Sequence, residues 1–276
     1  MLDPAERPGA DGADQLSSGK SYDIAWDQIQ GRRRTQQDCA VCVPMGVARH
    51  LLVLADGMGG HAAGDVASSV AVTSFCGAFE APGMPDEPSE RLMASLEAAN
   101  CAIHDRVAAE PELTGMGTTL VAAVVEGRDL RWASVGDSPL WLVRGGEIRR
   151  LNANHSVAGE LAEQVAAGVM TAAEAAEAPG RAMLYSALLG GDVDLVDIPE
   201  TPERLEPGDV VMIASDGVET CGPDELIGIV RDGDDAAAEL VDRVLAAVDD
   251  REIDYQDNAT LIVCRLPLSD NQVASE

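Results

Sequence analysis

The stretch LLVLADGMGGH, residues 51–61, changes character at its midpoint. Residues 51–55 are all apolar and predict a short buried strand, which runs directly into Asp56 and Gly57. From residue 61 to residue 79, small side chains recur at three- and four-residue spacing, and this predicts a helix that packs close to a sheet. This stretch therefore predicts a strand, an Asp-Gly turn and a helix in immediate succession.

Before and after residues 51–79, segments with the apolar periodicity of strands occur together with segments that have the periodicity of helices. We expect further helices at 89–109 and 237–248, and two short ones within 156–180, which look like an insertion over one sheet edge. Strands are expected at 22–29, 41–43, 210–214 and 259–265, with an antiparallel meander formed by 118–125, 130–135, 140–143 and 147–151. Strands in groups, separated by helices, indicate an α+β fold. One domain is expected at 21–267, between a disordered leader (1–20) and a loose tail (268–276).

The charge balance excludes several classes of partner. The chain has 276 residues, 19 basic and 48 acidic, with a formal net charge of −29. Such a surface repels nucleic acid and anionic membranes. The acidic N-terminal segment has no apolar run, and no stretch reaches the roughly 18 apolar residues of a membrane helix, so we expect a cytoplasmic protein. A phosphorylated substrate could approach only where bound cations reverse the local field.

The six cysteines include a single Cys-x-x-Cys pair, Cys39 and Cys42. In a strand these two side chains point to opposite faces, and neither a second pair nor a His pair accompanies them. We therefore interpret them as small buried thiols rather than as a metal or redox site.

Acidic residues recur at one structural position, next to an apolar strand and beside Gly or Asn in most cases. They are Asp38, Asp56, Asp137, Asp216 and Asp257. A single such residue is best explained as a turn former. Five together suggest carboxylates gathered at one sheet edge, which repel one another unless they are protonated or share cations. Oxygen ligands of this kind suit Mg²⁺ or Mn²⁺ rather than zinc.

Gly57 strengthens the metal interpretation. Because it has no side chain, its carbonyl can approach a cation that Asp56 also binds. Asp56 would then bridge two metals, as a two-metal hydrolytic site requires. Four carboxylates balance the charge of two divalent ions, and a phosphate can then enter.

In their order along the chain, these motifs resemble the metal-dependent protein phosphatases (the PPM family, protein phosphatase type 2C) of bacterial type. The matching stretches are RRTQQD (33–38), ADGMGGHAAG (55–64), GMGTT (115–119), VGDS (135–138), NHS (154–156), SDG (215–217) and DNAT (257–260). The resemblance covers about residues 22–266. It implies a central sandwich of two antiparallel β-sheets flanked by α-helices on both sides (four-layer αββα), a metal cleft at one end, and a mobile flap at 156–192.

The resemblance also implies roles for individual residues. Asp56 would bridge two core metals, Gly57 would help to hold one through its carbonyl, and Asp216 and Asp257 would hold the other. Asp38 would lie beside the cluster, bound through water, and Asp137 matches a position linked to a third, weaker metal. The expected cofactors are therefore two or three Mn²⁺ or Mg²⁺ ions. Arg33 matches the phosphate-binding arginine, since a guanidinium holds two phosphate oxygens; the alternative for Arg32, Arg33 and Arg34 is a solvated patch or a targeting run.

The implied activity is hydrolysis of phosphoSer and phosphoThr in proteins by a hydroxide that bridges the two metals, with Arg33, Asp38 and Asp56 as the catalytic set. The expected setting is a cytoplasmic monomer that opposes a Ser/Thr kinase or acts on its substrates. Met58 stands where eukaryotic relatives have a His that acts as general acid; we interpret His61 and His155 as structural. Two alternatives stay open, a non-catalytic binding module of the same fold and a small-molecule phosphatase.

Overall fold

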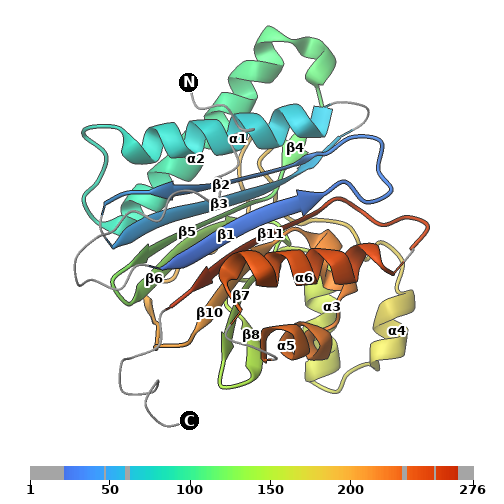
Figure 1. Cartoon of the computed structure of the whole chain (residues 1–276). Helices are drawn as coiled ribbons and strands as arrows, with labels where there is room; N and C mark the ends of the chain where they lie inside the picture. The colour runs from blue at the N-terminus through green and yellow to red at the C-terminus, as the bar shows by residue number, and fades with distance from the viewer. Residues whose placement is uncertain (1–21, 47, 60–62, 232–234, 252, 267–276) are drawn as a thin grey trace.

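Two antiparallel sheets lie face to face at the centre of the molecule (Figure 1). The computed structural model describes residues 22–46, 48–59, 63–231, 235–251 and 253–266, so the expected leader and tail lie outside it. Sheet 1 contains, in spatial order, β1 (Asp23–Ile29), β11 (Ala259–Arg265), β10 (Val210–Ala214), β7 (Leu140–Arg144) and β8 (Glu147–Arg150). Sheet 2 contains β2 (Asp38–Pro44), β3 (Arg49–Met58), β5 (Leu120–Glu126), β6 (Asp129–Val135) and β9 (Glu203–Arg204), and β4 (Gly117–Thr118) pairs with β3.

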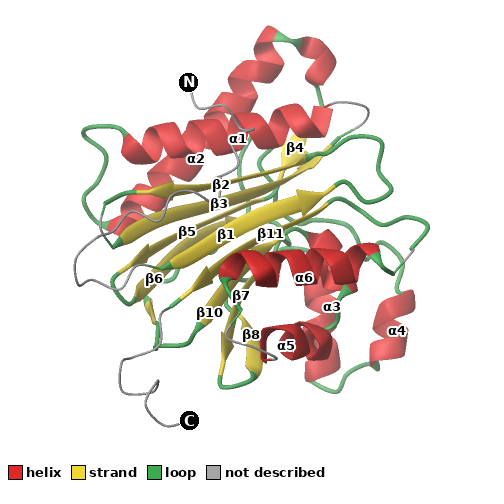
Figure 2. Ribbon diagram, viewed as in Figure 1, coloured by secondary structure: helices red, strands yellow, loops and turns green. Residues whose placement is uncertain are grey.

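Helices cover the outer face of each sheet, so the expected four-layer αββα sandwich is confirmed (Figure 2). Helices α1 (Ala63–Glu80) and α2 (Pro88–Ala109) lie over sheet 2, whereas α5 (Pro223–Arg231) and α6 (Ala237–Asp249) lie over sheet 1. The predicted insertion contains α3 (Val157–Ala166) and α4 (Ala172–Glu177), and two single turns are η1 (Pro111–Leu113) and η2 (Asp216–Thr220). Within the described ranges, no helix combines the length and apolar content needed to cross a bilayer.

Three apolar cores between the four layers explain why the strands are hydrophobic on both faces. In β3, Leu51 and Val53 pack under α1 and α2, whereas Leu52 and Leu54 pack into the interior of the sandwich. All four side chains are fully buried. A strand buried on both faces has a continuous apolar run instead of an alternating one, which is the pattern at residues 51–55.

The predicted meander at 118–151 is wrong in one respect. Strands β5 and β6 pair in sheet 2, but β7 and β8 pair in sheet 1, so the chain crosses between the sheets at 136–139. The sequence of each strand indicates how far it is buried, but it does not show which sheet the strand joins. The crossing matters because it carries Asp137 to the edge where the two sheets meet. The helix α5 and the turn η2 were not predicted either.

The Cys-x-x-Cys pair occupies opposite faces of β2, as expected. Cys39 packs against the core under α1, and Cys42 packs against the interior of the sandwich. Each is partly rather than fully buried. Burial raises the pKa of Cys39 to about 11, so this thiol is protonated at neutral pH and is a poor ligand or nucleophile.

Candidate active site

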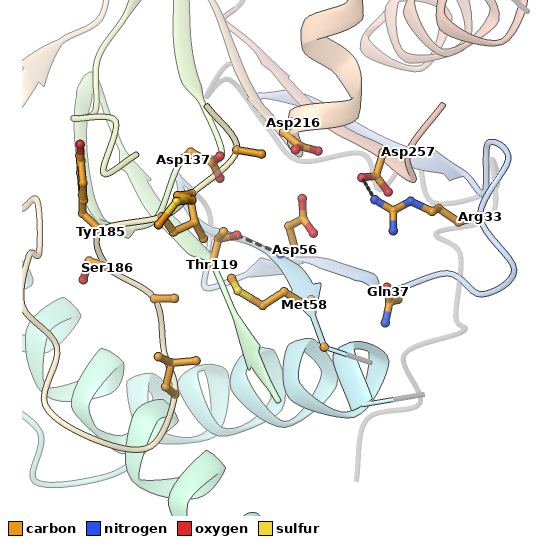
Figure 3. A pocket seen from close by; sticks show the side chains of 17 residues that line it. Arg33, Gln37, Asp56, Met58, Thr119, Asp137, Tyr185, Ser186, Asp216 and Asp257 are labelled. Atoms are coloured by element: carbon orange, nitrogen blue, oxygen red, sulfur yellow. Dashed lines mark hydrogen bonds and ion pairs between the residues drawn. The ribbon is translucent and has the colours of Figure 1, made fainter. Parts of the chain in front are cut away.

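The five aspartates come from strand ends at one edge of the sandwich. Because neighbouring strands are antiparallel, the end of β3 meets the start of β2, and the end of β10 meets the start of β11. The structure brings Asp56, Asp137, Asp216 and Asp257 around one cavity of about 520 Å³, together with Arg33 (Figure 3). Asp38 is buried beside them, with 7% of its surface exposed. The convergence expected from the sequence is therefore observed.

Asp38 and Asp56 are direct partners in the ladder between β2 and β3. Like charges in such facing positions repel each other, because the two side chains are only about 5 Å apart at Cβ. One oxygen of Asp38, Oδ2, accepts hydrogen bonds from Ser215 Oγ (2.7 Å) and Thr260 Oγ1 (2.6 Å). The other oxygen, Oδ1, is buried without a hydrogen-bond partner. The carboxylate is thus fixed at one end, and its second oxygen is left available at the acidic cluster.

Burial and neighbouring negative charges raise the pKa values of the clustered carboxyl groups. Burial raises the pKa of Asp56 well above its usual range, and the charges of Asp38 and Asp216 raise it further. Burial, with help from the charges of Asp137 and Asp257, raises the pKa of Asp216 to about 7. Burial likewise raises the pKa of Asp38 to about 6. The fold therefore holds acidic groups in a place where each needs a proton or a cation to offset its charge.

The donor set fits hard divalent cations. Buried carboxylate oxygens without partners are present on Asp38 and Asp216, and such oxygens are what Mg²⁺ and Mn²⁺ bind. Among the described side chains, no three His, Cys, Asp or Glu groups form a ready cage for one ion.

Gly57 is required by close packing. A Cβ at this position would lie 2.0 Å from the carbonyl oxygen of Gly64 and 2.6 Å from that of Gln37. The Gly57 amide donates to the Gln37 carbonyl at 3.1 Å. Two glycines of the ADGMGGHAAG motif therefore let the end of β3, the start of α1 and the segment before β2 meet, and any side chain would force them apart.

Arg33 lies at the rim of the cavity on a loop that Asn258 holds in place. The Asn258 side chain accepts from the Gln37 amide (2.9 Å) and donates to the carbonyls of Gln30 (2.8 Å) and Thr35 (3.1 Å). The Arg33 guanidinium donates to Asp257 Oδ2 at 2.5 Å and keeps about half of its surface exposed. This placement supports an anion site rather than a patch remote from the cluster.

Sequence reasoning missed the polar groups that hold the aspartates. Thr119 Oγ1 accepts from the Asp56 amide (3.0 Å) and lies 2.8 Å from Ser138 Oγ, so the GMGTT and VGDS motifs support each other. Arg150 donates to the Asp137 carbonyl at 2.6 Å and is paired with Glu219 of η2 at 3.4 Å. The two motifs could have suggested the first contact. No motif near Arg150 in the sequence indicates its contact with Asp137.

The second wall of the cavity is formed by residues 182–187 and Leu189, within the expected flap. His155 connects this wall to the Asp137 crossing, since its Nδ1 accepts from the Gly136 amide (3.2 Å) and its carbonyl accepts from the Tyr185 amide (2.8 Å). These two contacts support the structural interpretation of His155. Met58 lines the same cavity. His61 lies outside the described residues, so its expected role stays a prediction.

Known proteins share this architecture and these motifs. The family model described as protein phosphatase 2C matches residues 30–261. The serine/threonine protein phosphatase PstP of Mycobacterium tuberculosis is 37% identical over 181 residues, which are 64% of this chain and 33% of that protein. The chain thus spans about a third of that relative's length. The protein phosphatase PhpP of Streptococcus pneumoniae is 34% identical over 192 residues, 68% of this chain and 75% of that protein.

Solved structures agree with the sequence matches. The serine/threonine phosphatase of S. agalactiae superposes with a TM-score of 0.77 at 28% identity, covering 89% of this chain and 99% of that chain. The catalytic domain of PstP in complex with two manganese ions superposes with a TM-score of 0.73 at 29% identity, covering 89% and 98%.

Proposed function

Because this chain belongs to the protein phosphatase 2C family, we propose that it is a metal-dependent protein phosphatase that hydrolyses phosphoSer and phosphoThr. The observation that carries the proposal is the meeting of Asp56, Asp216 and Asp257 with Arg33 around one cavity. An anionic centre that fits divalent cations, with a guanidinium at its rim, suits the binding of a phosphate monoester.

The proposed cofactors are two or three Mn²⁺ or Mg²⁺ ions, in line with the two manganese ions in the PstP catalytic domain. In this proposal Asp56, the Gly57 carbonyl, Asp216 and Asp257 would hold the two core ions. Asp38 would contribute through water, and Asp137 would hold a third ion. When bound, the ions would supply Lewis-acid chemistry at the phosphate and activate the attacking water.

The chain's own residues then do the positioning. Arg33 directs two N–H groups at phosphate oxygens, as guanidinium groups do, and its flexible side chain can leave Asp257 to do so. Asp38 is held by Ser215 and Thr260, so its free oxygen keeps one orientation towards the cluster. Thr119 fixes the backbone of Asp56. Fixed groups of this kind lower the cost of reorganisation during the reaction.

The proposed substrates are phosphorylated proteins, and the proposed role is to oppose a Ser/Thr kinase or to act on its substrates. The named activities of the bacterial relatives support this class of substrate. We propose further that residues 21–267 form the catalytic domain with a flap at 156–192, and that the protein acts in the cytoplasm as a monomer. Size-exclusion chromatography and cell fractionation test the last two statements.

The test of the activity is hydrolysis of a phosphothreonine peptide in Mn²⁺, with and without a chelator. We expect the chelator and Asp56→Ala each to lower kcat/KM by about 10³-fold or more, as expected when the centre of a two-metal site is removed. Asp242→Ala is the matched control, because Asp242 is exposed on α6, away from the cavity lining. Equal activity in all samples contradicts the proposal.

The two alternatives give different results in the same experiment. A binding module of this fold would take up Mn²⁺ in calorimetry yet hydrolyse no phosphoester. A small-molecule phosphatase would hydrolyse sugar phosphates with a higher kcat/KM than any phosphopeptide.

A further inference from the structure

Exposed apolar side chains gather at one wall of the candidate active site. Of the seven large hydrophobic side chains that are exposed in the described residues, three line this cavity: Met183 (62% exposed), Tyr185 (45%) and Leu189 (55%). We call these three residues the apolar wall. Single exposed apolar side chains are common, but several at the mouth of one cavity indicate a binding surface.

The backbone of the apolar wall is anchored from both sides. The Met183 carbonyl accepts from the Val157 amide (2.9 Å), and the Tyr185 amide donates to the His155 carbonyl (2.8 Å). Leu188 exchanges two hydrogen bonds with Thr118 of β4 (2.9 and 3.1 Å). These hydrogen bonds hold the backbone of the wall beside the cavity, and a backbone held in this way lowers the ordering cost of binding.

Two side chains of the apolar wall, those of Tyr185 and Leu189, also make contacts of their own. The Tyr185 hydroxyl donates to Glu160 of α3 at 2.5 Å. Leu189 lies over Gly117, where an added Cβ would come within 2.3 Å of Leu189 Cδ2. Gly117 thus leaves room for Leu189 to lie beside the cavity. The hydrogen bond of Tyr185 and the contact of Leu189 with Gly117 hold these two side chains at the mouth of the cavity.

Tyr185 of the apolar wall and Arg33 lie on opposite sides of Asp56 and Asp216 (Figure 3). Figure 3 shows Tyr185 on one side, Arg33 and Asp257 on the other, and Asp56 and Asp216 between them. A phosphate held at the aspartates and Arg33 therefore places the residues that flank it against the wall. Acidic flanking residues would meet a protein of net charge −29, so repulsion disfavours them, whereas apolar ones would lose water-exposed surface on the wall.

We propose that the apolar wall binds an apolar side chain that neighbours the phosphorylated Ser or Thr, and so selects phosphoprotein segments with apolar flanks over those with acidic or uncharged polar flanks. This inference rests on the proposed phosphatase function. It concerns Met183, Tyr185 and Leu189 and requires no contact between these residues and the metals.

The experiment compares two phosphothreonine peptides that differ only in one flanking residue, Leu or the nearly isosteric Asn. We expect kcat/KM of the wild-type protein to be about tenfold higher for the Leu peptide, as burial of much of one Leu side chain implies. In Met183→Ser/Leu189→Ser this ratio should fall towards one. Because the ratio is measured on one enzyme at a time, a change in overall activity cancels.

Val169→Ser is the matched control, since Val169 is 73% exposed but does not line the cavity. It should keep the wild-type ratio. Equal kcat/KM for both peptides in the wild type, or an unchanged ratio in the double variant, overturns the inference. A self-association that the double variant abolishes would assign the wall to a second copy of the chain and would also overturn it.

Failure of the proposed function is distinguishable. If the wild-type protein hydrolyses neither peptide nor p-nitrophenyl phosphate, the phosphatase assignment fails. Calorimetric binding of the same two peptides then tests the wall, and equal affinities contradict it.

Discussion

Asp38 and Asp56 face each other across β2 and β3, with Ser215 and Thr260 both donating to the same oxygen of Asp38. Two facing carboxylates would normally weaken a strand pair. Here the hydroxyl groups come from the opposite sheet and fix Asp38 in place. The fold therefore holds the two carboxylates together at the edge where the sheets meet. A bound cation would offset the repulsion between them.

Stability of the metal-free protein should fall as pH rises. Burial raises the pKa of Asp38 to about 6 and that of Asp216 to about 7, so the folded state retains protons that the unfolded chain has already released. For an acid with a raised pKa, the stabilisation is present below the unfolded value, about 4, and is lost as pH rises through the folded value. In chelator, the melting temperature should be several degrees higher at pH 5 than at pH 7.5.

Asp38→Asn isolates part of this effect. The Asn side-chain oxygen can still accept from Ser215 and Thr260, while the charge facing Asp56 is removed. We expect this variant to be more stable than wild type at pH 7.5 in chelator, by on the order of 2 kcal/mol. A variant that is less stable, with an unchanged pH slope, would show that repulsion between the two carboxylates does not govern the stability of this edge.

The ion pair with Asp257 places the Arg33 guanidinium beside the aspartates, so replacement of Arg33 should weaken phosphate binding. Arg33→Ala should lower kcat/KM for a phosphopeptide by about 10²-fold and weaken inhibition by inorganic phosphate. Arg33→Lys should be intermediate, because an ammonium lacks the two-pronged geometry. Arg32→Ala is the control, an exposed neighbour that does not line the cavity; equal losses in both alanine variants would contradict the assignment.

Replacement of Asn258 should lower both the stability of the protein and its affinity for phosphate. Its buried side chain makes three hydrogen bonds to the loop that carries Arg33. Asn258→Ala leaves those backbone groups without partners and should cost about 2–3 kcal/mol of unfolding free energy in a urea titration. If the loop positions Arg33, inhibition by phosphate also weakens. A loss of stability with unchanged phosphate inhibition would limit Asn258 to a structural role.

Arg150 and its neighbour Arg149 offer a matched pair on β8. Arg150 is partly buried and links the Asp137 carbonyl to Glu219, whereas Arg149 is exposed and pairs with Glu203. Arg150→Met should lower the number or affinity of bound Mn²⁺ ions in calorimetry, because the segments that carry Asp137 and Asp216 lose their connection. Arg149→Met should resemble wild type. Equal titrations for the two variants would rule out the linking role.

Much of this site could be predicted because its main residues carry local signals. Asp56 and Asp216 follow apolar runs and precede Gly, and Asp257 precedes the last strand beside an Asn. The fold class followed from strands that occur in groups. Each signal lies within a few residues of the group it identifies.

The supporting contacts could not be predicted for the opposite reason. Thr260 and Ser215 reach Asp38 over separations of 222 and 177 residues, and only the pairing of the two sheets brings them together. The crossing at 136–139 could not be predicted because the residues of β6 and β7 show that these strands are buried, but not which sheet each one joins. The apolar wall was missed because the packing of residues 182–189 against β4 and His155 has no short-range pattern.

The metal site at the meeting edge of the two sheets is tested most directly by a crystal structure of the protein grown or soaked in Mn²⁺, with anomalous diffraction to locate the ions. We expect two or three manganese peaks in the cavity, within about 2.2 Å of carboxylate oxygens of Asp56, Asp216 and Asp257. Manganese found only elsewhere on the surface, with these three carboxylates free of it, would contradict the proposed two-metal site.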